Sequence, residues 1–118
     1  MIRSKRSQML LRDLLVALDA MQDKSLIAGA FILPDGQCCA LGALGIARGI
    51  DPKDLISLAD NNLLAAKLFG ASMSLIMEIE RINDQALERR YKTSYEVQEQ
   101  RWERTRKWVA SKIGSANA

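Results

Sequence analysis

The fold is decided by the stretch from Gly29 to Gly49, which reads GAFILPDGQCCALGALGIARG. Two almost uncharged apolar arms, residues 26–33 and 38–47, flank the turn residues 34–37. Within the turn, Pro presets φ and Gly accepts a positive φ. We therefore expect the arms to fold back on each other as a short, buried β-hairpin near residues 29–40.

The second arm has the composition of a helix, which we expect to begin at about Ala40 and to stop at Gly49. Gly42, Gly45 and Gly49 resemble a glycine-rich phosphate loop only superficially. The residues between them are apolar and helix-forming. Tight helix packing is therefore the role that we expect for these glycines.

The chain on either side has the apolar period and the end signals of helices. Met9–Met21 has one apolar face, and Ser7 is in position to cap it. Asp51 and Pro52 open a short helix near Lys53–Asp60, because the first is an N-cap residue and the second suits the first helical turn.

Three further signals follow. A short helix over Leu63–Phe69 ends at Gly70, and Ser72 or Ser74 begins a longer one. The apolar stripe of the longer helix consists of Leu75, Ile76, Ile79, Ile82 and Ala86. Thr93-Ser-Tyr-Glu96 is a capping box that opens a helix to about Ile113. One face of that last helix is predicted to carry Tyr95, Gln98, Trp102, Thr105, Val109 and Ile113.

Together these signals predict a mainly α (α+β) fold. We expect one compact domain over residues 1–118, with about five helices and the single short β-hairpin. Residues 1–6 form a basic N-terminal tail, and residues 114–118 are expected to be frayed. No linker, repeat or low-complexity segment divides the chain.

The chain of 118 residues contains no histidine. Its absence removes the usual partner of a serine or cysteine nucleophile and the commonest zinc ligand. Two cysteines cannot build a four-ligand zinc site. No carboxylates are spaced like a known acid–base or Mg²⁺ site, and no phosphate-binding loop is present. We therefore expect a protein that is not an enzyme, with no cofactor and no metal.

The two cysteines, Cys38 and Cys39, are adjacent and lie in an apolar context. They are predicted to be buried, reduced thiols of a cytoplasmic protein. Each apolar arm is about half the ~20 residues that a membrane span requires. Arg12 and Asp13 interrupt the N-terminal apolar run where a signal peptide would be unbroken. No membrane association is expected.

Asn83 falls inside an apolar stripe, four residues after Ile79, where an apolar side chain would be the default. A buried amide needs hydrogen-bond partners. One interpretation is structural: the amide closes a loop. The alternative is functional: Asn83, with Asp84 beside it, presents polar groups into a cleft.

The charge is unevenly distributed along the chain. Residues 1–12, 13–87 and 88–112 have net charges of +4, −5 and +4. On the last helix the cations spread around most of the circumference, whereas a helix that binds nucleic acid gathers them on one face. We expect a solvated helix with Glu–Arg pairs. Nucleic-acid contact through residues 3–6 and 89–92 stays open. The candidate binding residues are Asn83, Asp84, Asp35, Gly36, Arg89, Arg90, Arg101, Arg104 and Trp108.

Several short motifs follow one another in a particular order: Asp35-Gly36, Cys39-Ala-Leu-Gly42-Ala-Leu, Asn83-Asp84 and Thr93-x-x-Glu96-Val97. This order resembles that of a family of small uncharacterised proteins from bacterial, phage and prophage genomes, a domain of unknown function. The resemblance spans roughly Gly29 to Val109. It implies a phage or mobile-element context and no particular activity.

Three functions stay open. The first is a non-catalytic phage accessory protein that binds a host protein, such as an inhibitor of a nucleic-acid-targeting defence system. The second is a small-molecule or nucleotide binder with Asn83, Asp84 and the Asp35-Gly36 turn facing one pocket. The third is a basic DNA-binding accessory protein. A homodimer is compatible with each.

Overall fold

Six helices make up the part of the chain that the structure, a computed structural model, describes: residues 4–58, 61–86 and 93–116, with the backbone alone for 114–116. In chain order the helices are α1 (Lys5–Ala20), α2 (Ala40–Ala47), α3 (Pro52–Ser57), α4 (Asn62–Phe69), α5 (Met73–Asp84) and α6 (Ser94–Ala116). The mainly helical expectation is confirmed.

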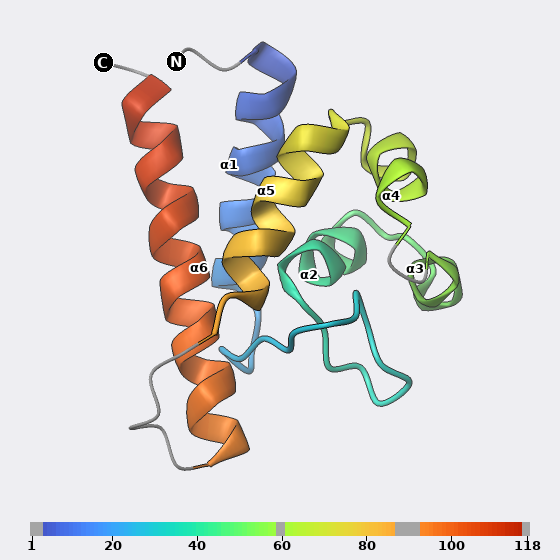
Figure 1. The fold of residues 1–118 in the computed structure, drawn as a ribbon, viewed down its shortest axis with the longest axis vertical. Helices are drawn as coiled ribbons and strands as arrows, with labels where there is room; N and C mark the ends of the chain where they lie inside the picture. Colours follow the sequence, from blue (N-terminus) through green and yellow to red (C-terminus); the bar gives the residue numbers. More distant parts are fainter. Residues whose placement is uncertain (1–3, 59–60, 87–92, 117–118) are drawn as a thin grey trace.

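Helices α1 and α6 run antiparallel, side by side, and α5 crosses them (Figure 1). Helix α2 packs against both α1 and α5, while α3 and α4 lie on the side of the molecule away from α6. The core lies where α1, α2, α5 and α6 meet. Its fully buried side chains include Leu11, Leu14, Leu41, Ile76, Ile79 and Val109.

Helix ends follow the local signals in most places. The side chains of Asp51 and Ser72 accept hydrogen bonds from backbone N–H groups of the first turns of α3 and α5. Thr93 Oγ1 accepts from the Glu96 N–H at 3.0 Å, as the capping box predicts. The predicted start of α1 is wrong: Ser4, not Ser7, caps it, and the helix begins at Lys5. The last helix was expected to end at about Ile113, whereas α6 continues to Ala116.

The predicted β-hairpin is wrong. Among the described residues the arms make one antiparallel bridge, Ile32 with Cys38, and no strand forms. The second arm has no room to extend the pairing, because α2 begins at Ala40. The Ala40 N–H, at the start of α2, donates to the side chain of Asn83.

The glycines of α2 permit close packing, as their spacing indicates. A Cβ atom on Gly42 would lie 1.9 Å from the carbonyl oxygen of Phe31, so the loop crosses directly over the helix. A Cβ on Gly45 would lie 2.7 Å from Leu55 of α3. The loop and α3 therefore approach the backbone of α2 at two positions where a side chain on the helix would block the contact.

A membrane span was not expected from the apolar arms. Among the described residues, no single helix combines the length and the apolar composition needed to cross a membrane. The pair α4 and α5 passes such a test only when taken together, across a bend of 110°.

Candidate binding groove

Asn83, at the end of α5, connects three segments that are distant in sequence. Its side chain is buried, with 1% of its surface exposed. Oδ1 accepts from the Ala40 N–H at 2.9 Å, and Nδ2 donates to the Ile27 carbonyl at 2.8 Å. Nδ2 also donates to Asp84 Oδ1 at 2.8 Å. The amide thus ties α5 to the start of α2 and to the loop before it.

Two arginines of α6 bind the C-terminal end of α5. Arg101 Nε donates to the Asn83 carbonyl at 2.8 Å. The guanidinium of Arg104 donates to the carbonyls of Ile82, Gln85 and Ala86 at 3.1, 2.6 and 3.3 Å. A helix C-terminus leaves carbonyls without intrahelical partners and carries partial negative charge. The two guanidinium groups therefore provide hydrogen-bond donors for the free carbonyls at the C-terminal end of α5.

Arg101 was expected on a solvated face, and that expectation is wrong, because only 8% of its surface is exposed. Burial lowers the pKa of its guanidinium, and the Asp84 carboxylate opposes that fall. Burial also lowers the pKa of Arg104, helped by the charge of Arg101. Both arginines stay charged at neutral pH.

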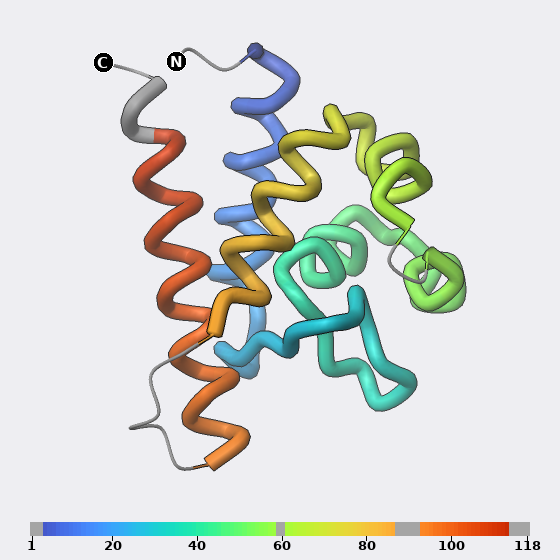
Figure 2. Tube along the Cα trace, in the orientation of Figure 1, coloured from blue at the N-terminus to red at the C-terminus, as the bar shows by residue number. Residues whose placement is uncertain are grey.

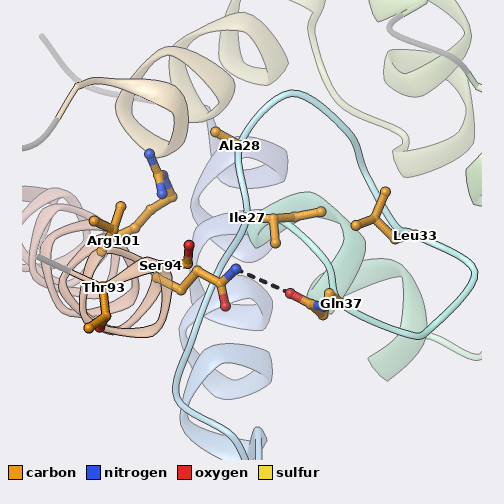
Figure 3. A pocket seen from close by; sticks show the side chains of 9 residues that line it. Ile27, Ala28, Leu33, Gln37, Thr93, Ser94 and Arg101 are labelled. Carbon is orange, nitrogen blue, oxygen red and sulfur yellow. Dashed lines mark hydrogen bonds between the residues drawn. The ribbon is translucent and has the colours of Figure 1, made fainter.

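A groove of about 530 Å³ lies between the loop that follows α1 and the N-terminal half of α6. Figure 2 shows that loop passing below the end of α5 and beside α6. We call this hollow the α6 groove. It is lined by Ile27, Ala28, Leu33, Gln37, Thr93, Ser94, Val97, Gln98 and Arg101 (Figure 3).

The loop is fixed to α6 by hydrogen bonds that shape the groove. The Leu26 N–H donates to the Gln98 carbonyl at 3.0 Å. Gln98 Nε2 donates to Gln37 Oε1 at 3.2 Å across the groove (Figure 3). Gln37 Nε2 in turn donates to Asp35 Oδ2 at 2.7 Å. The two amides therefore bridge the groove, apolar side chains of the loop and of α6 line the rest, and Arg101 is the one charged side chain among the described lining residues.

Asp35 and Gly36 do not join Asn83 and Asp84 at one pocket. Asp35 is exposed and accepts from the backbone and side chain of Gln37, which lowers the pKa of its carboxyl. Gly36 lines a separate groove of about 290 Å³ between α1 and α2, which neither Asn83 nor Asp84 lines. The turn geometry uses the φ of 92° at Gly36.

The other candidates lie elsewhere. Trp108 is half-buried on α6, with the Lys112 ammonium 5.8 Å from its ring centroid. Asp84 Oδ1 accepts from Asn83 and, at 3.4 Å, from the Gly29 N–H. Arg89 and Arg90 lie outside the residues that the structure describes.

The thiols of Cys38 and Cys39 are free and buried, as predicted. Burial raises the pKa of Cys38 to about 11 and that of Cys39 to about 12. Both are neutral at pH 7 and poor nucleophiles. Within the described ranges no three acidic, cysteine or histidine side chains gather as a metal site requires.

Sequence reasoning missed Gln37 and Gln98 as groove residues. They are 61 residues apart, and nothing in their local sequence pairs them. The one available signal was that Gln37 ends a turn flanked by apolar arms, and its side chain must therefore reach a polar partner or solvent.

Comparison with known proteins returned no matching family model, no matching curated protein and no matching solved structure. The resemblance to a phage and prophage family stays a prediction.

Proposed function

We propose that this protein is a non-catalytic binding protein and that the α6 groove receives an extended segment of a partner protein. The observation that supports this most is the groove itself, whose volume lies in the range of ligand sites and whose lining combines apolar side chains with the amides of Gln37 and Gln98. The described residues of its lining include no cysteine, lysine or carboxylate that could act as a nucleophile or a general base.

The dimensions suit a peptide. From Thr93 to Arg101 the groove follows α6 for eight residues, or about 12 Å at the helical rise. An extended chain covers that length with about four residues. Ala28, at the exposed edge, offers its backbone N–H and carbonyl, because neither pairs with a described residue. Backbone groups of this kind pair with extended peptides.

The two alternatives have less support. A nucleotide site or single-stranded nucleic-acid site usually offers an aromatic side chain for stacking, and the described residues that line the α6 groove include none. A DNA-binding face would need the cations of α6. Arg101 and Arg104 are bound to α5, and Arg106 pairs with Asp19 of α1 at 2.6 Å.

The partner class follows from the resemblance alone. A protein of a bacterial host, with a component of a nucleic-acid-targeting defence system as the specific expectation, stays the predicted partner.

The test is capture of a partner by tagged protein from a bacterial lysate, compared between two variants. Ala28→Trp fills the groove, whereas Ala20→Trp adds the same side chain at an exposed position of α1 outside it. We expect stoichiometric capture by the wild type and Ala20→Trp and loss with Ala28→Trp, with all three equally folded by circular dichroism. Equal capture by both variants would contradict the proposal.

A further inference from the structure

We propose that the α6 groove is specific for a peptide segment with an acidic side chain, which Arg101 binds. This inference rests on the proposed function and adds the chemistry of the ligand. The starting point is that Arg101, with 8% of its surface exposed, is the one charged residue among the described residues that line the groove.

Arg101 retains hydrogen-bonding capacity. Its Nε donates to the Asn83 carbonyl at 2.8 Å, whereas no described residue accepts from its two Nη groups. These groups form the planar end of the guanidinium, which matches the two oxygens of a carboxylate. The bond at Nε holds the plane in one orientation, so the arginine is positioned before a ligand arrives.

The local charge favours an anion. Arg101 lowers the pKa of its neighbour Arg104, and Asp84 is the acid that acts on Arg101. Asp84 is itself engaged by the Asn83 amide and the Gly29 N–H. Among the described residues, the two cations and one carboxylate leave a net positive charge at this partly desolvated site, where an added carboxylate interacts strongly.

The remaining lining favours a peptide over a free anion or a phosphate ester. Ile27, Leu33 and Val97 offer apolar contacts, and the amides of Gln37 and Gln98 can exchange hydrogen bonds with a peptide backbone. An inorganic anion would make no use of the apolar side chains.

The experiment selects peptides from a random dodecapeptide library displayed on yeast, using the full chain as bait. Selected peptides are synthesised and their dissociation constants measured by fluorescence anisotropy. We expect an Asp or Glu at one constant position, and replacement of that acid by its amide should weaken binding about tenfold or more, the effect of losing a charge-assisted hydrogen bond. Affinity should also fall with added salt.

Charge variants at the exposed Ala28 test the site without touching the structural bonds of Arg101. Ala28→Glu should weaken binding at least fivefold, Ala28→Lys should keep or strengthen it, and Ala20→Glu should leave it unchanged. If the Arg101→Met variant folds, the effect of the acid-to-amide change in the peptide should disappear. If it does not fold, the Ala28 pair decides.

Two outcomes distinguish the proposed peptide groove from its proposed specificity for an acidic side chain. Peptides that lose binding to Ala28→Trp but bind Ala28→Glu and Ala28→Lys equally would overturn the acidic specificity and leave the groove as a peptide site. Failure to select any peptide that depends on the groove would overturn both.

Discussion

Asn83 is a single residue whose three side-chain hydrogen bonds hold α5, α2 and the preceding loop together. Removing the amide leaves the Ala40 N–H and the Ile27 carbonyl without partners in a buried place. We expect Asn83→Ala to lower the free energy of unfolding by about 1–3 kcal/mol, the cost of unsatisfied buried groups. Thermal denaturation followed by circular dichroism measures this. The exposed amide Gln22→Ala is the control, and an unchanged melting temperature in Asn83→Ala would refute the structural role.

Gly42 and Gly45 of α2 provide a matched pair of substitutions, because an added Cβ would meet a different kind of atom at each. A Cβ at Gly42 meets the backbone oxygen of Phe31, whereas one at Gly45 meets the flexible end of Leu55. We expect Gly42→Ala to destabilise by about 2–3 kcal/mol. Gly45→Ala should cost about 1 kcal/mol or less, because Leu55 can rotate and alanine favours the helix. Chemical denaturation measures both, and equal effects would contradict the contact with Phe31.

The buried thiols predict how stability depends on pH. An unfolded thiol loses its proton near pH 8.5, whereas the pKa values of Cys38 and Cys39 are raised to about 11 and about 12. Their contribution to stability is therefore fully present below about pH 8.5 and is lost as the pH rises toward 11. Between pH 9 and 11, Cys39→Ala should show a slope shallower than that of the wild type by about 1.4 kcal/mol per pH unit. Identical slopes in urea denaturation would count against this burial.

At the scale of helices, α5 depends on α6 for its C-terminal end. Arg104 donates to four carbonyls there, those of Ile82, Asn83, Gln85 and Ala86, and Arg101 also donates to that of Asn83. We expect Arg104→Met to fray the last turn of α5 and to cost about 1 kcal/mol. Native-state hydrogen exchange should show faster exchange at residues 82–85 and little change in α1.

The control is Arg81→Met, which removes an exposed cation from the same helix. If both variants exchange alike, the loss of charge and not the lost hydrogen bonds explains the effect.

At the scale of the whole molecule, one core joins the ends of the chain. Val109 of α6 and Leu11 and Leu14 of α1 are fully buried in it, together with Ile76 of α5. A domain with a single core usually unfolds in one step. We expect tryptophan fluorescence, which reports on α6, and far-ultraviolet circular dichroism, which reports on all helices, to give coincident transitions. Two separate transitions would indicate that α3 and α4 unfold independently.

The candidate site could be predicted from the sequence only in part. Asn83 could be singled out because a polar residue at an apolar position needs partners. Its partners could not, because Ala40 and Ile27 are 43 and 56 residues away. Arg101 was expected on a solvated helix because the helical period alone does not reveal that the C-terminal end of α5 packs against this residue. The α6 groove depends on the same long-range docking.

What the sequence by itself determined is local. The caps at Asp51, Ser72 and Thr93 and the end of α4 at Gly70 were predictable, because each depends on residues within one helical turn. The tertiary structure alone decided that the arms around Pro34 make one bridge, since the first arm bends at Gly29 and its Ile27 N–H donates to the Cys38 carbonyl. The Ala40 N–H, at the start of α2, finds its acceptor in Asn83 of a distant helix. A hydrogen-bond donor has one proton to give, and its choice between a local and a distant acceptor is settled only when the core packs.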